Sequence, residues 1–225
     1  MRTITLSGRG PNTMSIAMLA EIERALDEAK DEPLLVTGAG SAFSAGLDLD
    51  SLATLEPSGV RDLLVAMERV THRLFLHSAP TVALVNGHAI AGGCLVAQCC
   101  DVRVAMRDPK LRIGMTGVAI GLTYPPFVFD VFGARLAAPN VEKVLLSAAR
   151  FDVDEALALG LVDEVTSDAA ARASTLLAER AALPLASYAS TKLALRKPRV
   201  DASAADRARF LDEVIPRWTA ALLRR

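Results

Sequence analysis

The chain has 225 residues, of which 52% are hydrophobic, and its 25 basic and 26 acidic side chains give a formal net charge of −1. This length is sufficient for one buried core, and the composition excludes an intrinsically disordered chain. Because a net charge near zero supplies no long-range positive field, nucleic acids and anionic membranes are not expected partners.

No uncharged run approaches the roughly 18 apolar residues that span a bilayer, and the chain opens on alternating strand-like residues. We therefore expect a cytoplasmic protein. The cysteines Cys94, Cys99 and Cys100 lie in one short segment whose spacing matches neither a disulfide framework nor a CxxC metal site. We expect small, buried apolar residues there and no metal.

The first half of the chain alternates between strand and helix patterns. The helical spacing of apolar residues from 18 to 26 follows Ser15, a candidate N-cap. The expected elements are strands over 2–6, 34–37, 81–85 and 102–105, helices over 18–26, 58–77 and 94–99, and loops or turns over 38–50 and 86–93. This alternation predicts an α/β fold with parallel strands.

The second half is expected to become helical. Helices are predicted over 140–146 and 153–159, and Pro184 and Pro198 divide the segment after residue 169 into three more. The last has an apolar face that could fold back or pack on another subunit, formed by Phe210, Leu211, Ile215, Trp218, Leu222 and Leu223. The expected organisation is an α/β core over 1–168 and a helical C-terminal subdomain over 169–225.

Two glycine-rich segments each follow a predicted strand. They read GAGSAFSAGLD over 38–48 and VNGHAIAGGCLVAQCCD over 85–101. The first lacks the Lys-Ser/Thr ending of a P-loop and, taken alone, is equally well a tight connection. Backbone N–H groups at glycine turns and helix starts stabilise anions. Two such turns could aim two N–H groups at one thioester oxygen as an oxyanion hole.

These segments resemble the two signature motifs of the crotonase superfamily, the enoyl-CoA hydratase/isomerase family. The matching stretches are FSAGLDL over 43–49 and NGHAIAGGCLVAQCCD over 86–101, followed by ALALGLVDEV over 156–165 and a Thr191-Lys192 helix start. SAGLDL with AGGCLVAxxCDxR is most similar to the enoyl-CoA isomerase branch. The resemblance implies a crotonase-like spiral of β-β-α units.

It also implies an acyl-CoA substrate whose thioester oxygen accepts the backbone N–H groups of Leu47 and Gly92. Coenzyme A would enter as part of the substrate, with no covalently bound cofactor, and the protein would form a homotrimer or a dimer of trimers. The residues that would border the CoA path are Ser44, Ala45, Gly46, Asp48 and Gly93.

The acid-base residues of the family are absent from their expected positions. Hydratases of this family have two glutamates and isomerases the later one, and the corresponding residues here are Leu95 and Gly117. Because hydration needs groups that activate water and transfer a proton, the resemblance with these replacements disfavours a hydratase.

Three hypotheses follow. A base could come from elsewhere, with His88, Tyr124, Asp48 and Asp50 as candidates, although a lone histidine in a turn is more often structural. The stretch GMTGVAIG resembles a branch of naphthoate synthases, which implies a bound anion near Gly117 and CoA lyase activity. In the third hypothesis the protein is a weakly active or inactive acyl-CoA-binding paralogue. We favour an enzyme most similar to an enoyl-CoA isomerase.

A basic cluster, Arg196, Lys197 and Arg199, precedes the last predicted helix. Such a cluster is most often a solvated loop between helices. Its functional alternative is a grip on the phosphates of coenzyme A.

Overall fold

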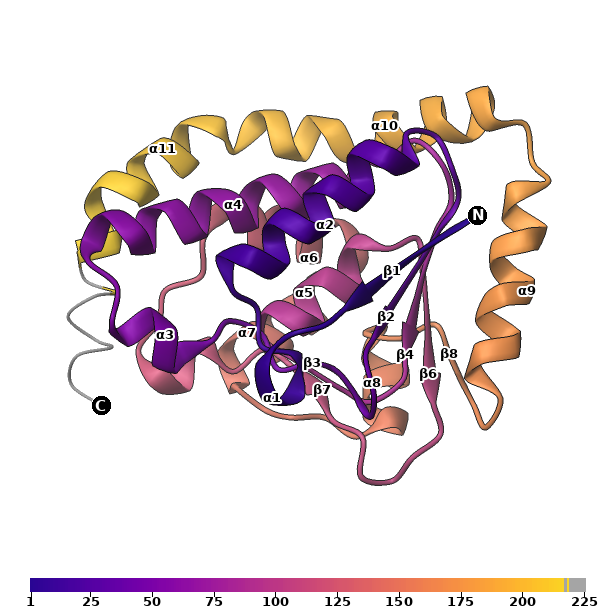
Figure 1. Cartoon of the computed structure of the whole chain (residues 1–225), viewed down its shortest axis with the longest axis horizontal. Helices are drawn as coiled ribbons and strands as arrows, with labels where there is room; N and C mark the ends of the chain where they lie inside the picture. The colour runs from indigo at the N-terminus through magenta and orange to yellow at the C-terminus, as the bar shows by residue number, and fades with distance from the viewer. Residues whose placement is uncertain (217, 219–225) are drawn as a thin grey trace.

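Eight parallel strands form two sheets in the computed structural model, which describes residues 1–216 and Trp218 (Figure 1). The five-stranded sheet has the order β1 (Arg2–Leu6), β2 (Leu34–Gly38), β4 (Thr81–Val85), β6 (Val102–Met106) and β8 (Glu164–Thr166). The three-stranded sheet has the order β3 (Ala42–Ser44), β5 (His88–Ile90) and β7 (Ile113–Gly114).

The chain passes between the two sheets three times, and each pass is one turn of a spiral. A strand of the large sheet is followed by a strand of the small sheet and then by helix, as in β2, β3 and the helices α3 (Leu49–Ala53) and α4 (Pro57–Phe75). The pair β4 and β5 leads into α5 (Gly92–Cys99), and β6 and β7 lead into α6 (Pro126–Arg135). This repetition of β-β-α units confirms the predicted fold class.

Helices cover both faces of the large sheet. A small cluster that includes Val82, Val104, Ala173 and Leu177 packs α9 (Ala169–Ala181) onto one face. The main core lies on the other side with α2 (Ile16–Ala29) and α4. The predicted cap of α2 is present, since the Ser15 hydroxyl accepts the Met18 N–H at 3.3 Å.

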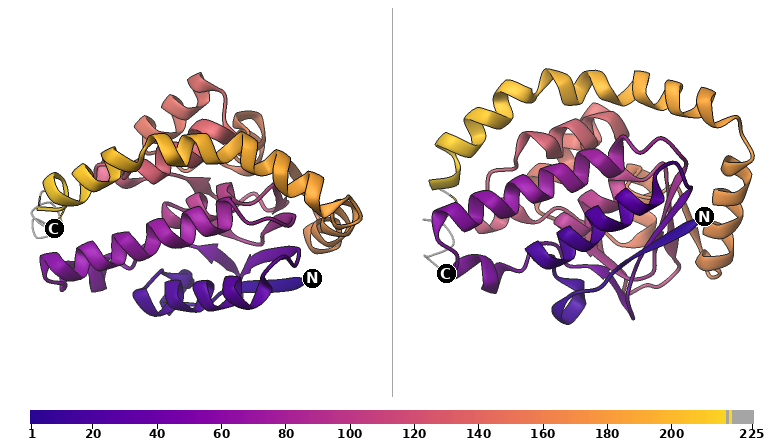
Figure 2. Two further views of the ribbon diagram at one scale, coloured as in Figure 1. Left: turned by 90° about the horizontal axis from the view of Figure 1, so that it is seen from above. Right: turned by 45° about the horizontal axis from the view of Figure 1, so that its top comes forward.

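The C-terminal helices α10 (Leu185–Ala202) and α11 (Ala204–Glu213) form a band along the outside of the molecule (Figure 2). Phe210, Ile215 and Trp218 are buried within the chain, which settles the fold-back alternative for this part of the apolar face. Leu222 and Leu223 lie outside the described residues. The remaining helices are α1 (Arg9–Asn12), the short 3₁₀ helix η1 (Gly117–Ile120), α7 (Ala138–Ser147) and α8 (Val153–Leu159).

Several sequence predictions were wrong in detail. The expected loop over 38–50 contains β3 and the turn over 86–93 contains β5. These three-residue strands form because they pair within the small sheet, β5 with both β3 and β7. Helix α10 begins at Leu185, so Thr191 and Lys192 lie within the helix rather than at its start. The helix also continues through Pro198 instead of ending there.

The basic cluster also lies within α10 rather than in a loop, and Arg196 is buried. Lys197 pairs with Asp201 on the same helix, with an N–O distance of 2.6 Å. The cysteines are free thiols buried in the core, as predicted.

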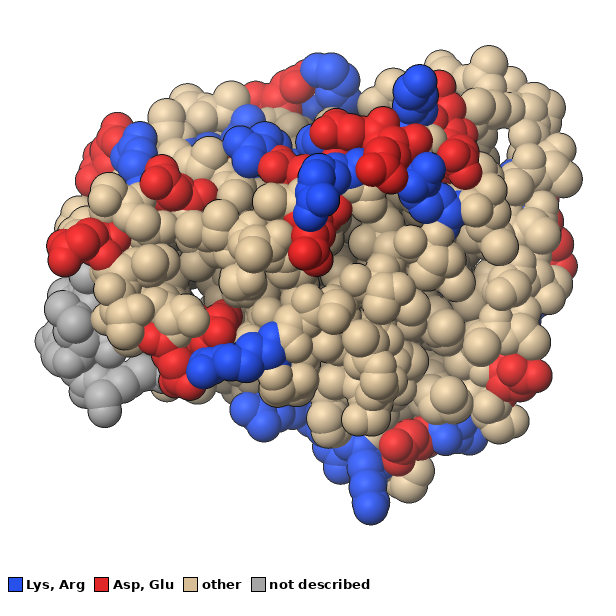
Figure 3. All heavy atoms as spheres, viewed as in Figure 1, with Lys and Arg blue, Asp and Glu red and all other residues tan. Residues whose placement is uncertain are grey.

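Charged side chains of both signs are interspersed on the face shown in Figure 3. Part of this mixture is a row of ion pairs between α2 and α4, Arg69 with Glu23 and Arg73 with Asp27. Within residues 1–216 and Trp218, no helix has the length and apolarity of a membrane span.

Candidate active site

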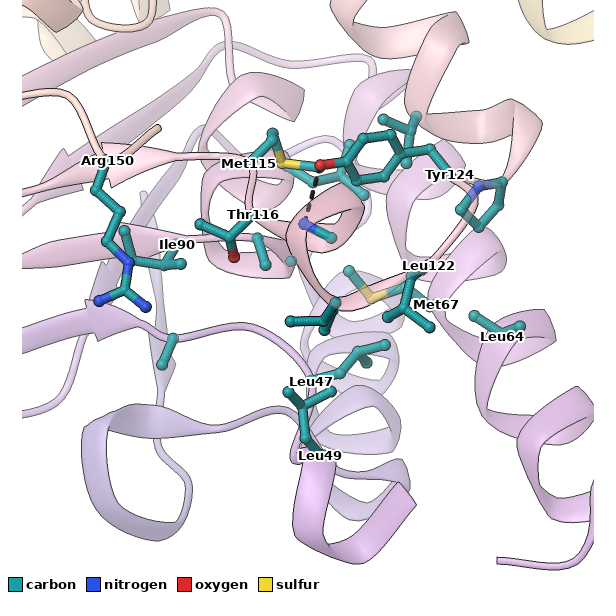
Figure 4. A pocket seen from close by; sticks show the side chains of 18 of the residues that line it. Leu47, Leu49, Leu64, Met67, Ile90, Met115, Thr116, Leu122, Tyr124 and Arg150 are labelled. Atoms are coloured by element: carbon teal, nitrogen blue, oxygen red, sulfur yellow. Dashed lines mark hydrogen bonds between the residues drawn. The ribbon is translucent and has the colours of Figure 1, made fainter. Parts of the chain in front are cut away.

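A cavity of about 370 Å³ opens where the small sheet meets α4, α5 and α6. Its apolar part includes Leu64, Met67 and Leu122, which Figure 4 shows together on one side. The opposite side in this view carries Arg150, Thr116 and Ile90. The cavity therefore has a polar end and an apolar end, which suits a ligand with the same division.

The segment that carries Leu47 pairs with Met14 through the backbone groups on either side of Leu47. Met14 forms a parallel bridge with Leu47: its N–H donates to the Gly46 oxygen at 2.8 Å and its oxygen accepts the Asp48 N–H at 3.1 Å. Because backbone groups alternate in direction along an extended chain, the N–H of Leu47 itself points to the other side. Leu47 lines the cavity there.

The second N–H comes from the first residue of α5. Ala91 has a φ of 51°, and this sharp turn starts the helix at Gly92 on the cavity wall. The N–H of a first helical residue has no acceptor within its own helix, and the positive end of the helix dipole lies there. Gly92 thus offers a donor of the kind an oxyanion needs.

Two glycines allow the two segments to approach. At Gly46, where φ is 81°, a Cβ atom would lie 2.6 Å from the Gly92 nitrogen, and at Gly93 it would lie 2.2 Å from the Ser44 oxygen. Neither position has room for a side chain. The backbone next to Leu47 is therefore packed directly against the start of α5.

The other predicted CoA-path residues have different placements. Ala45 lines the cavity, whereas Ser44 is buried and its hydroxyl donates to the Asn12 oxygen at 2.8 Å and accepts the Gly46 N–H at 3.1 Å. Ser44, Gly46, Asp48 and Gly93 are not among the cavity-lining residues of the described chain. Their contacts shape the loop that carries Leu47.

Asp48 is a helix cap. Its carboxylate accepts the Ser51 N–H at 3.2 Å and pairs with Arg9 at 3.0 Å, and these contacts lower its pKa, with the Ser51 hydrogen bond making the largest contribution. Asp50 also pairs with Arg9 and is exposed. Asp48 caps the N-terminus of α3 and Asp50 lies in its first turn. This matches their more ordinary interpretation as a cap and a surface residue.

The two positions to which the resemblance assigns the glutamates of the family hold Leu95 and Gly117. Leu95 is buried and lines the cavity. The ring of Tyr124 covers Gly117: a Cβ atom at Gly117 would lie 2.8 Å from Cε1 of Tyr124. Where the anion hypothesis assumes an empty volume beside Gly117, the structure has an aromatic ring.

Tyr124 also bonds to this glycine. Its hydroxyl oxygen accepts the Gly117 N–H at 3.0 Å, drawn as a dashed line in Figure 4. Burial raises the pKa of the Tyr124 hydroxyl, and the backbone N–H groups of Gly117 and Val118 offset this only in part. Tyr124 is therefore protonated at neutral pH and is a proton donor rather than a base.

His88 presents a donor as well. It lines the cavity, and its Nδ1 lies 3.0 Å from the Arg112 N–H, from which it accepts a hydrogen bond. In a neutral imidazole that accepts at Nδ1, the proton is on Nε2. The free nitrogen of His88 is then an N–H group, not a lone pair.

Sequence reasoning missed a buried charge cluster behind the site. Asp101, the last residue of the second motif, bonds to Lys192 at 2.8 Å, to Arg196 at 2.6 Å and to the Tyr188 hydroxyl at 2.8 Å. Arg135 donates to carbonyl oxygens at the C-terminal end of α5. The motif gave a signal in Asp101, but its partners lie some 90 residues away.

Comparisons with known proteins agree with this architecture. A model of the family "Enoyl-CoA hydratase/isomerase" matches residues 1–210. The chain is 29% identical over 197 residues to mitochondrial enoyl-CoA delta isomerase 1 of Mus musculus, covering 84% of this chain and 68% of that protein. It is 34% identical over 160 residues to crotonyl-CoA hydratase of Syntrophomonas wolfei, covering 68% and 60% respectively.

A solved structure is similar over nearly the whole chain. An enoyl-CoA hydratase/isomerase family protein from Pseudomonas syringae superposes with a TM-score of 0.88 at 26% identity, covering 94% of this chain and 93% of that one. The motifs, the spiral of β-β-α units and these matches lead to one conclusion: the chain belongs to the enoyl-CoA hydratase/isomerase family and has the crotonase fold.

Proposed function

We propose that the protein binds an acyl-CoA thioester in this cavity and stabilises the thioester enolate with the N–H groups of Leu47 and Gly92. One observation carries the proposal. The Met14 bridge turns the Leu47 N–H away from its neighbouring strand, and the Ala91 turn starts α5 at the same wall. Two preorganised donors at one oxygen are the main requirement for enolate stabilisation.

The general class of reaction follows from the family, in which the relatives include isomerases and hydratases. Leu95 and Gly117 offer no carboxylate to activate water, so we propose that hydration of a short enoyl-CoA is negligible. An isomerase-like enolate chemistry is the assignment we favour. The alternatives are a CoA lyase assisted by a bound anion and a weakly active acyl-CoA-binding paralogue.

Infrared spectroscopy of a bound thioester tests this proposal directly. A saturated acyl-CoA labelled with ¹³C at the thioester carbonyl should show a carbonyl band at lower wavenumber when bound, because two N–H donors polarise the C=O bond. Unlabelled thioester provides the difference spectrum. Binding without a band shift would remove the oxyanion hole from the proposal, and absence of binding would remove the whole of it.

The resemblance also leads us to propose a homotrimer or dimer of trimers in the cytoplasm. The described apolar residues of the C-terminal segment are used within the chain, so this assembly would need other surfaces. Sedimentation equilibrium of the full chain gives the oligomeric state.

A further inference from the structure

We infer that the substrate is a 2-carboxyacyl thioester, that its enolate forms by loss of carbon dioxide, and that Tyr124 then donates a proton to the α-carbon. This inference rests on the proposed function, because it needs the thioester oxygen to lie at Leu47 and Gly92.

The polar side chains that line the cavity are predominantly donors. Tyr124 and His88 each use an acceptor atom on a backbone N–H, which leaves the O–H and the Nε2–H for a ligand. Arg150 is exposed and makes no hydrogen bond or ion pair with the described residues. In the part of the chain that the structure describes, no Asp or Glu side chain lines this cavity.

Such a set of donors fits an anionic acyl group. Two arginines that line the cavity, Arg112 and Arg150, favour entry of a carboxylate through their charge. The apolar walls further inside disfavour a localised carboxylate charge relative to one that spreads toward the thioester. A carboxylate attached at the α-carbon would experience both effects.

Loss of carbon dioxide is the route to an enolate that requires no base. The bond between the α-carbon and the carboxylate carbon breaks, and its electron pair moves into the enolate, whose oxygen carries the negative charge between the two N–H groups. The carboxylate leaves as neutral carbon dioxide. The enolate carbon then takes the proton of the Tyr124 hydroxyl, and the tyrosinate regains a proton from water, so one proton is consumed per turnover.

The hydroxyl oxygen of Tyr124 is held in place beside the cavity. Its oxygen is fixed by the Gly117 N–H at 3.0 Å, so its hydrogen must point elsewhere, and Tyr124 lines the cavity. The two Pro residues that follow, Pro125 and Pro126, begin α6 and restrict the backbone beside it. A fixed donor next to an oxyanion hole is what protonation of an enolate needs.

The test uses the full chain with malonyl-CoA and methylmalonyl-CoA. We expect release of carbon dioxide with formation of acetyl-CoA and propionyl-CoA, and in D₂O one deuterium at the α-carbon in place of the carboxylate. Tyr124→Phe should lower kcat by about 10² to 10⁴-fold, the usual contribution of a general acid, with a much smaller change in KM.

Tyr188→Phe is the matched control, because the chain has two tyrosines and the Tyr188 hydroxyl bonds to Asp101 outside the cavity. It should retain the wild-type kcat. Equal activity of the two variants would overturn the role of Tyr124. Incorporation of more than one deuterium into product would overturn a base-free mechanism.

A wild-type protein that releases no carbon dioxide from either thioester, yet shows the ¹³C carbonyl shift with a saturated acyl-CoA, would overturn this inference and leave the proposed function intact. A protein that shows neither would overturn both.

Discussion

The hydroxyl of Tyr124 accepts the backbone N–H of Gly117 at 3.0 Å, while its ring takes the place of any side chain at residue 117. One residue thus fills the volume and bonds the backbone at the position to which the resemblance assigns the glutamate of the isomerases. The identity of residue 117 therefore cannot be changed without regard to residue 124.

Gly117→Glu alone should destabilise the protein. A new Cβ atom would lie 2.8 Å from the Tyr124 ring, and overpacking of this kind costs about 1 to 3 kcal/mol. Urea unfolding of the variant and the wild type measures the difference. A variant as stable as the wild type would show that the ring moves aside freely.

The double variant Gly117→Glu with Tyr124→Ala should accommodate the glutamate side chain without the steric contact that Gly117→Glu alone makes with the Tyr124 ring. It should also gain isomerisation of a β,γ-enoyl-CoA, since a general base contributes about 10² to 10⁴-fold. Tyr124→Ala alone is the control for the enlarged cavity. If the double variant folds, binds substrate and shows no gain, residue 117 does not face the reacting carbons.

Gly92→Pro should remove one oxyanion donor while keeping the helix start, because proline fits the first position of a helix and has no N–H. Gly92→Ala is the reference, since it keeps the N–H. Its Cβ would meet the Met14 sulfur and the Met67 methyl group at 3.2 Å and the Gly46 Cα at 3.3 Å, and the proline variant adds the same Cβ. Relative to Gly92→Ala, we expect the proline variant to lose about 10² to 10³-fold in kcat. The ¹³C carbonyl band should shift less in the proline variant, which keeps only the Leu47 donor, than in the alanine variant.

Trp218 should report on binding. It is the single tryptophan of the chain, lines the cavity and donates its indole N–H to the Thr123 oxygen at 2.9 Å. An acyl group in the cavity changes the polarity around the indole. Titration with a long-chain acyl-CoA should therefore change the tryptophan emission, and free coenzyme A should change it less.

Asp101→Asn should destabilise the fold in a pH-dependent way. Burial opposes ionisation of Asp101, but Lys192 and Arg196 outweigh it and lower the pKa of the carboxyl group. Its contribution is present above the ordinary aspartate pKa of about 4 and is lost as the pH falls through the lowered folded-state value. At pH 7 the loss should be about 3 to 5 kcal/mol, the cost of leaving buried cations without their partner.

Urea unfolding from pH 7 to pH 3 checks this, and the gap between variant and wild type should narrow with acidification. Asp212→Asn is the control, because its pair with Arg61 is exposed and should contribute about 0 to 1 kcal/mol. If the two substitutions lower the free energy of unfolding equally, the buried Asp101 cluster contributes no more to stability than an exposed ion pair.

Local sequence patterns predicted much of the fold. The period-two segment over 2–6, the Ser15 cap and the helix ending at Gly160 depend on neighbouring residues, and each is present. Strands β3, β5 and β7 have two or three residues, too few for a periodic pattern, and form because they pair with each other. The sequence patterns predict no helix over 126–135, although Pro126 is well suited to the first turn of α6.

The candidate site also has one part that the sequence predicts and one part that only the tertiary fold reveals. Leu47, Gly92, Leu95 and Gly117 could be named from their positions in motifs, and all line the cavity. The contact between Tyr124 and Gly117 depends on how a turn folds back over seven residues, and no pattern predicts it. The Asp101 cluster joins α10 to the end of α5, so its composition follows only from the tertiary fold.

The ring of Tyr124 over Gly117 also restricts how this chain could acquire a carboxylate by mutation. A glutamate introduced first would meet the ring, and removal of the ring first would leave a hole and a backbone N–H without its acceptor. Either order passes through a protein less stable than the present one. The contact between Tyr124 and Gly117 therefore makes the two positions change together rather than one at a time.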